Sequence, residues 1–229
     1  MALYAIGDLH LSLGGEKPMD VFGPAWENHV ERLQNAFSLL KEDDVTVLCG
    51  DLSWGMSLAE SLPDFRFIDA LPGKKILLKG NHDYWWNTAS KMKRFFEENG
   101  LTTLEILHNN CLPYGEVCLC GTRGWFYELD NEGTHDGKVL AREIGRLETS
   151  LQAAGEREKL CFLHYPPLYQ GYRCPEILRL LQRYGVRRCC YGHLHGAAQH
   201  RAIEGWAEGT EFSLVSADYL GFIPKKICD

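Results

Sequence analysis

The feature that most constrains the fold is a recurrence of short apolar runs, each of which ends at a glycine or a polar residue. The runs read ALYAIGD, VTVLCGD, KILLKGN, VCLCGTRG, KLCFLHY, RRCCYGH and FSLVSAD. Each has the length of a strand, is rich in β-branched and other buried-type residues, and stops at a turn-forming residue. The pattern therefore predicts a protein built on several short, buried strands.

Helical periodicity occupies several of the intervals between these runs. Thr88 is suited to cap a helix, and Pro175 and Gly185 stand where another helix would begin and stop. Strands alternate with helices over residues 1–80, which predicts βαβ units and a largely parallel sheet, whereas later segments are richer in consecutive strands. We expect one α/β domain over residues 1–229 with mixed sheets, and helices at residues 25–40, 88–99, 138–154 and 175–184.

Composition narrows the class of protein. Hydrophobic residues make up 45% and charged residues 24% of the chain, as in ordinary globular proteins. The net charge of −7 argues against duplex nucleic acid as a partner, because such binding needs a basic surface. The N-terminal sequence MALYAIGDLHLS lacks the basic segment of a signal peptide, and no apolar run is long enough to span a membrane. We therefore expect a cytoplasmic location.

The cysteines show neither of the patterns that stabilise small folds. None of the nine forms a CxxC pair, so neither a disulfide framework nor a structural zinc site is predicted. The adjacent Cys189 and Cys190 are either a redox-sensitive pair or two strand positions that face opposite sides of a sheet.

Polar side chains follow five of the predicted strands at the point where each strand ends. The carboxyl ends of the strands in an open α/β sheet gather the functional groups. Residues two apart on an extended segment also point the same way. One such residue alone is more often a turn carboxylate or a core histidine. Five of them at strand ends predict a single site. It is made by Gly7-Asp8-Leu9-His10, Gly50-Asp51, Gly80-Asn81-His82-Asp83, His164 and Gly192-His193-Leu194-His195.

The chemistry of this set is that of a metal site. Carboxylate, imidazole and amide groups without a thiolate suit Mn, Fe, Zn or similar divalent ions. The inventory is too large for one ion, whereas two ions that share one carboxylate would use it fully. Two ions about 3.5–4 Å apart can hold both the attacking and the leaving oxygen of a phosphoryl displacement. The candidate ligands are Asp8, His10, Asp51, Asn81, His164, His193 and His195.

The motifs GDLH, GD, GNHD, a lone His and GHLH, in that order, resemble those of the calcineurin-like metallophosphoesterase superfamily. The resemblance extends from Asp8 to His195, and the C-terminal VSADYLGFIPKKI is similar to the closing strands of these enzymes. It implies a two-sheet mixed β-sandwich flanked by α-helices, with a dinuclear metal centre at one edge.

The resemblance also implies a role for each ligand and a reaction. Asp51 would bridge the ions, and His82 would assist the leaving group while a metal-bound hydroxide attacks phosphorus in line. Asp83 either orients His82 by a hydrogen bond or caps the turn. The first ion would be held by Asp8, His10 and His195, and the second by Asn81, His164 and His193.

Several residues near the strand ends are candidate substrate contacts. Many relatives carry Asp or Asn a few residues after the bridging Asp, where this chain has Ser53 and Trp54, so substrate choice stays open. Arg123 is either a phosphate contact or a solvated loop arginine. Aromatic residues form either core or an apolar wall suited to a base, lipid-like or aryl group; they are Trp54, Trp85, Trp86 and Trp125, with Trp26 and His29 as a further pair.

The predicted function is therefore hydrolysis of a phosphorylated small molecule with two divalent ions, Mn, Fe or Zn. One alternative is a nucleotide or cyclic-nucleotide phosphodiesterase, or a nuclease, although the acidic charge weakens the nuclease version. The other is a non-catalytic scaffold of the same fold, which the complete ligand set disfavours. The oligomeric state is not predicted.

Overall fold

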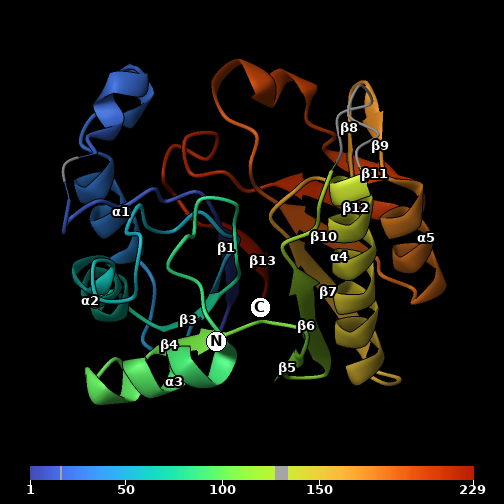
Figure 1. Cartoon of the computed structure of the whole chain (residues 1–229), viewed down its shortest axis with the longest axis horizontal. Helices are drawn as coiled ribbons and strands as arrows, with labels where there is room; N and C mark the ends of the chain where they lie inside the picture. Colours follow the sequence, from blue (N-terminus) through green and yellow to red (C-terminus); the bar gives the residue numbers. More distant parts are fainter. Residues whose placement is uncertain (16, 127–133) are drawn as a thin grey trace.

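The computed structural model describes residues 1–15, 17–126 and 134–229, and contains two large mixed sheets with helices on their outer sides (Figure 1). The first sheet has five strands in the order β13-β1-β2-β3-β4. Neighbours from β1 to β4 are parallel, and β13 pairs with β1 antiparallel. These strands are β1 Leu3–Ile6, β2 Val45–Leu48, β3 Lys74–Leu77, β4 Leu104–Ile106 and β13 Lys225–Cys228.

The second sheet has six strands in the order β11-β12-β10-β7-β6-β5. Its four central strands are parallel, and the edge strands β5 and β11 are antiparallel to their neighbours. The strands are β5 Cys111–Tyr114, β6 Val117–Thr122, β7 Glu158–Leu163, β10 Arg188–Tyr191, β11 Gly205–Ala207 and β12 Thr210–Leu214, and a separate hairpin is formed by β8 Leu168–Tyr169 and β9 Tyr172–Arg173.

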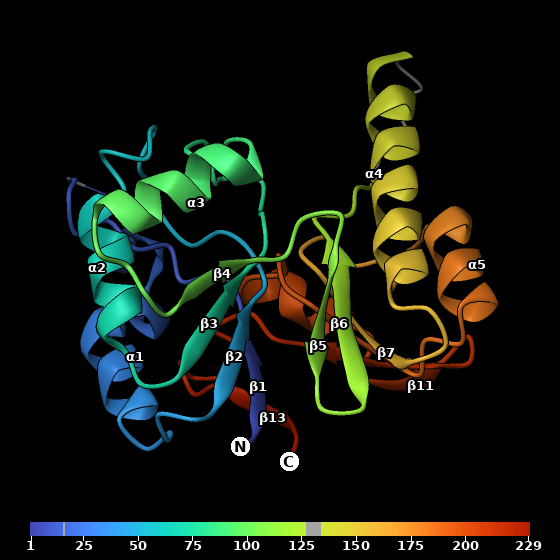
Figure 2. The same ribbon diagram turned by 90° about the horizontal axis from the view of Figure 1, so that it is seen from below.

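The helices lie on the two outer sides, as the turned view in Figure 2 shows. The first sheet is covered by α1, α2 and α3, and the second by α4 and α5. Their bounds are α1 His29–Phe37, α2 Leu62–Ala70, α3 Ala89–Glu98, α4 Thr134–Ala153 and α5 Pro175–Arg183, with short 3-10 helices η1 Met19–Phe22, η2 Pro24–Trp26 and η3 Gly196–Arg201.

Three apolar layers hold these elements together. One layer lies between the two sheets and includes Val47 of β2 and Phe162 of β7. The other two layers lie between each sheet and its helices, with Leu77 and Phe65 in one and Leu181 in the other. Because the central strands are buried on both faces, they appear in the sequence as nearly continuous apolar runs. This confirms the predicted two-sheet mixed sandwich flanked by helices.

Most predicted elements are confirmed. Thr88 caps α3 by accepting a hydrogen bond from the backbone N–H of Lys91 at 3.4 Å, and Pro175 is the first residue of α5. The helix expected at residues 25–40 is shorter, because η2 turns at Pro24 before α1 begins at His29. The sequence analysis did not identify α2, which has only nine residues and weak helical periodicity.

The cysteines and the lengths of the helices were the subject of two further predictions. All nine cysteines are free. Cys189 belongs to the layer beneath α4 and α5 and Cys190 to the layer between the sheets, so the pair faces opposite sides of β10. Across the described ranges, none of the helices has both the length and the apolar character needed to cross a membrane.

Candidate metal centre

The strand ends of both sheets bring the predicted ligands to one place. Asp8 follows β1, Asp51 follows β2 and Asn81 follows β3 in the first sheet. From the second sheet, His164 follows β7 directly, and His193 and His195 follow β10. A parallel bridge between Gly7 and Ser216 links the ends of β1 and β12, so the edges of the two sheets meet there. The site therefore forms where the carboxyl ends of both sheets converge.

The first group of donors consists of Asp8, His10 and His195, whose ligand atoms all lie within 4.8 Å of one another. The Nε2 atom of His195 is 3.2 Å from Oδ1 of Asp8 and 3.4 Å from Nε2 of His10. Asp8 and His10 are buried and His195 is half-buried. These are the three residues predicted for the first ion.

The second group is centred on the side-chain oxygen of Asn81. This Oδ1 lies 2.7 Å from Nε2 of His164 and 3.0 Å from Nδ1 of His193. Asp51 stands between the groups, because its Oδ2 is 3.8 Å from Nε2 of His10 and 3.5 Å from Nε2 of His164. Asp8, Asp51 and His164 also form a compact set of donors, which joins the two groups.

The backbone at the site is strained. Asp8, His10, Asp51 and His193 have φ values of 59°, 45°, 53° and 73°, in the left-handed region that non-glycine residues rarely adopt. Hydrogen bonds between the loops hold this conformation, including Asp8 N–H to the Gly50 carbonyl at 2.7 Å. Such strain persists only where the surrounding structure enforces it, and it clusters at functional sites.

Two glycines leave space for the carboxylates of Asp8 and Asp51. A Cβ atom at Gly80 would overlap the side chain of Asp51, and a Cβ atom at Gly192 would overlap the carboxylate of Asp8. Glycine therefore precedes Asn81 and His193 because the loops pass directly against the two acidic side chains.

Burial and charge shape the protonation of the site. Burial raises the pKa of Asp8, but the charge and the hydrogen bond of His195 outweigh it, so the pKa lies below its ordinary value. Burial and the nearby charge of Asp8 raise the pKa of Asp51. Burial lowers the pKa of His10 and of His193 to about 3, so both rings are neutral and can donate a lone pair. A divalent cation would relieve the repulsion of the carboxylates and accept these lone pairs, so the donor set fits such an ion.

Hydrogen bonds behind the ligands fix two of the rings. Nδ1 of His164 donates to the carbonyl of Cys49 at 3.0 Å, which leaves Nε2 facing Asn81. Nδ1 of His195 lies 2.9 Å from Oδ1 of Asp218, which leaves Nε2 facing Asp8. Partners of this kind orient histidine ligands in metal sites. Asp218 was not identified from the sequence, although it follows the run FSLVSA in the same way that Asp8 and Asp51 follow theirs.

A family model described as calcineurin-like phosphoesterase matches residues 1–197. The chain belongs to this family. No curated protein matches it. Among solved structures, a protein of unknown function from Aquifex aeolicus, AQ665, is similar with 18% identity and a TM-score of 0.52, covering 98% of this chain and 95% of that one. The protein TT1561 of Thermus thermophilus is 13% identical with a TM-score of 0.52, covering 84% and 81%. At these identities the two structures support the fold alone.

Membership of the calcineurin-like phosphoesterases implies divalent metal ions, and the Asp/His groups described above are a possible site for them. The family also implies a phosphorylated substrate.

Of the two roles predicted for Asp83, orientation of His82 is wrong. Its carboxylate accepts hydrogen bonds from the backbone N–H groups of Asp51, Leu52 and Gly80 at 2.7–2.9 Å and from Nε1 of Trp85 at 3.0 Å. It therefore ties the GNHD loop to the loop that carries Asp51 and does not orient the His82 ring. The alternative, a turn-capping residue, is the one that the structure supports.

The His82 ring lies beside the first group of donors. Its centroid is 5.7 Å from that of His10 and 4.6 Å from that of Trp54. Its backbone N–H donates to Oδ1 of Asp51 at 2.7 Å. Within the part of the chain that the structure describes, its buried Nδ1 has no hydrogen-bond partner. An unpaired buried nitrogen of this kind is rare in folded proteins.

The predicted aromatic wall is wrong for one of its members. Trp85 is only 1% exposed and packs edge-on against Phe65 of α2 at 4.7 Å, so it is a core residue and offers no surface to a substrate. Trp54, in contrast, stacks on His10 with centroids 5.0 Å apart. Trp26 also reaches the site, since its ring lies 5.7 Å from those of His10 and His195.

The remaining candidate contacts are engaged in packing. Trp86 lies against Trp85 and His108, with centroids 5.2 Å and 5.8 Å away. Arg123 pairs with the buried Glu143 at 3.3 Å and lies 4.7 Å over the Trp125 ring. A role of Trp86, Trp125 or Arg123 in substrate binding stays a prediction.

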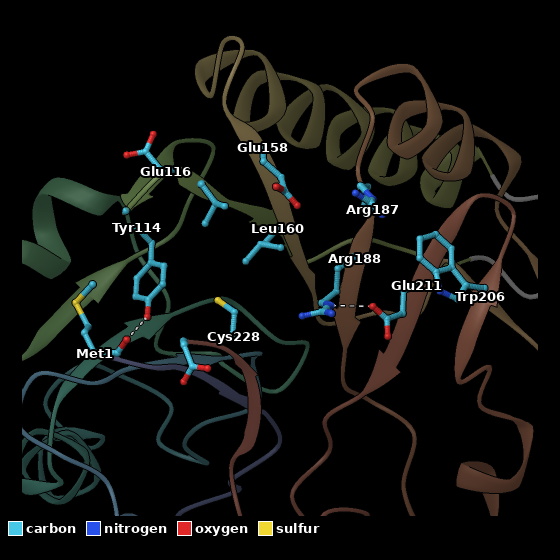
Figure 3. A pocket seen from close by; sticks show the side chains of 13 residues that line it. Met1, Tyr114, Glu116, Glu158, Leu160, Arg187, Arg188, Trp206, Glu211 and Cys228 are labelled. Atoms are coloured by element: carbon cyan, nitrogen blue, oxygen red, sulfur yellow. Dashed lines mark hydrogen bonds and ion pairs between the residues drawn. The ribbon is translucent and has the colours of Figure 1, made fainter.

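A cavity of about 610 Å³ lies away from the metal centre (Figure 3). Its lining includes Val117, Glu158 and Arg188, which are the first residues of β6, β7 and β10. It therefore opens at the amino edge of the second sheet, opposite the strand ends that carry the ligands. None of the candidate site residues lines it.

Proposed function

We propose that this phosphoesterase hydrolyses phosphate esters at a centre of two divalent metal ions. The observation that carries the proposal is the position of Asp51, whose Oδ2 stands between His10 and His164 at 3.8 Å and 3.5 Å. One carboxylate between two sets of nitrogen and oxygen donors is the arrangement that two ions sharing a ligand require.

Each residue of the centre has an assigned part. Asp8, His10 and His195 hold one ion, Asn81, His164 and His193 hold the other, and Asp51 is shared by both. Bound ions supply Lewis-acid activation of water and of the phosphoryl group. Imidazole, carboxylate and amide donors favour Mn, Fe or Zn. Asp83 and Asp218 keep Asp51 and His195 in place through the hydrogen bonds described above.

His82 is assigned to the leaving group. Its ring lies next to His10 and lines a cavity beside the first group of donors, which supports a contact with substrate and not with a metal ion. A protonated imidazole in this position donates a hydrogen bond, and in the transition state that proton, to the departing oxygen, and the ring is left neutral.

A nucleotide or cyclic-nucleotide phosphodiesterase is the second candidate, and the stacking of Trp54 on His10 favours it, because an aromatic side chain borders the reacting groups. A non-catalytic scaffold has less support, since every predicted ligand lies within the two groups or between them.

The test is a panel of esters assayed on the purified full chain with added Mn²⁺, Fe²⁺ or Zn²⁺. The panel holds p-nitrophenyl phosphate, bis-p-nitrophenyl phosphate and cyclic nucleotides. We expect metal-dependent hydrolysis of at least one ester, lost in His164→Ala and retained in His200→Ala, because His200 is exposed and outside both donor groups. No hydrolysis of any ester with any of the ions would overturn the proposal.

A further inference from the structure

An apolar recess of about 330 Å³ opens directly beside the first group of donors. Its lining includes three histidines of the candidate site, His10, His82 and His195. The side chains of Met19, Phe22, Trp26 and Trp54 form the rest of its wall. We call this cavity the aromatic recess. The walls come from η1, η2 and the loop after β2, so segments distant in the sequence converge on it.

The walls of the aromatic recess present hydrocarbon and ring surface. Nε1 of Trp54 donates to Sδ of Met19 at 3.3 Å, so the polar atom of this indole is already engaged. Trp26 is buried and held against Phe222 with centroids 5.4 Å apart. Phe22, however, is 67% exposed, although it borders a cavity next to buried rings. The side chain of Phe22 therefore leaves apolar surface uncovered at the recess.

The position of His82 relates the recess to the leaving group of the reaction. In an in-line displacement the leaving oxygen departs on the side opposite the attacking water. If His82 serves the leaving oxygen, the rest of the leaving alcohol extends over the His82 ring, and this ring lines the recess. The volume is at the low end of the range for small-molecule sites, about 300–1,000 Å³, and suits one ring system better than a long chain.

We propose that the aromatic recess is the leaving-group subsite of this phosphoesterase, and that its substrates are phosphate esters whose alcohol carries an apolar ring. The proposal rests on the proposed function and deepens it. Of the expected aromatic residues it keeps Trp54 and Trp26 and leaves out Trp85, which is core, and it adds Phe22.

The test compares esters with leaving alcohols of similar acidity, so that the contribution of His82 is the same for each. These are 2-phenylethyl phosphate and ethyl phosphate, each used as the monoester and as the methyl diester. We expect the wild type to prefer the phenylethyl ester on the order of 10-fold in kcat/KM, as ring stacking predicts. Phe22→Ala should lower kcat/KM more for the phenylethyl ester than for the ethyl ester, and so remove most of this preference.

Val21→Ala is the matched control, because Val21 is 71% exposed on the same 3-10 helix and does not line the recess. It should keep the preference, and thermal melts check that both variants fold. Equal rates on the two esters in the wild type, or equal losses in the two variants, would overturn the proposal. A stronger preference for n-octyl phosphate would assign the recess to an alkyl chain and overturn the ring class.

A binding measurement separates this proposal from the proposed function. Saturation-transfer NMR with 2-phenylethanol and the metal-free protein needs no turnover. Binding that is weakened in Phe22→Ala and kept in Val21→Ala supports the recess even if no ester is hydrolysed. Binding that is absent from the wild type, or equal in both variants, overturns it.

Discussion

The carboxyl and amino edges of the strands differ in backbone strain and in the burial of charged side chains. At the carboxyl edge, four candidate ligands have left-handed backbone angles and two carboxylates are buried side by side. At the amino edge, the cavity of about 610 Å³ is larger than the aromatic recess. Of the described residues that line it, only Gly115 has a positive φ. Arg188 there pairs with Glu211 at 2.9 Å on the surface.

The difference shows that the volume of a cavity does not indicate where the candidate metal centre of this molecule lies. Strained backbone and buried charges lower the stability of the folded chain, so they persist where a function needs them. An open cavity with partly exposed charges such as Arg188 and Glu211 needs no such compensation. Substitutions at the two edges should therefore have very different consequences.

The largest effect is expected for Asp51→Asn at the carboxyl edge. The variant keeps the size of the side chain but loses the charge that two ions would share, so turnover should fall below detection. Hydrolysis of bis-p-nitrophenyl phosphate with Mn²⁺ measures it. A rate near that of the wild type would mean that Asp51 is not the shared ligand.

The next effect is expected for His82→Ala. Loss of a proton donor lowers the rate about 10²–10⁴-fold. The loss should be smaller for p-nitrophenyl esters, which depart without protonation, than for alkyl esters. Metal content should be unchanged. Release of an ion from the variant would instead make His82 a ligand.

A smaller effect is expected for Asp218→Ala. Removal of the carboxylate 2.9 Å from Nδ1 of His195 frees this ring to turn, and loss of such a partner weakens metal binding about 10–100-fold. Asp218→Asn retains an acceptor oxygen and should restore most of the affinity in a Mn²⁺ titration. Equal affinities in all three proteins would show that Asp218 has only a structural role.

The smallest effect is expected for Glu211→Gln at the amino edge. The variant breaks the pair with Arg188, which is partly exposed to solvent. Activity should be unchanged and the free energy of unfolding should change by no more than about 0.5 kcal/mol. A loss of activity comparable to that of Asp218→Ala would contradict the contrast between the two edges.

The strand ends made most of the metal centre predictable. Asp8, Asp51 and His164 each follow an apolar run, and the ends of parallel strands meet at one edge whatever the details of packing. The role of Asp83 was harder to predict, because its partners at Asp51 and Leu52 come from a loop about 30 residues away.

The aromatic residues show why neighbours in sequence are weak evidence for a shared role. Trp54 and Trp85 both follow strand ends, but Trp85 is covered by Phe65 of α2 and Trp54 is not. Periodicity did not reveal α2, so nothing in the sequence analysis could assign Trp85 to the core. Trp26 gave no stronger signal, since its place beside His195 depends on how η2 folds over the strand ends.

The most direct measurement is the number of metal ions bound per chain. The full chain is stripped with a chelator, dialysed against Mn²⁺ and analysed by mass spectrometry of the metal, together with Asp51→Asn and the control His200→Ala. The account predicts two ions per chain in the wild type and in His200→Ala, and fewer than two in Asp51→Asn. One ion or none in the wild type, or two ions bound with unchanged affinity by Asp51→Asn, would contradict it.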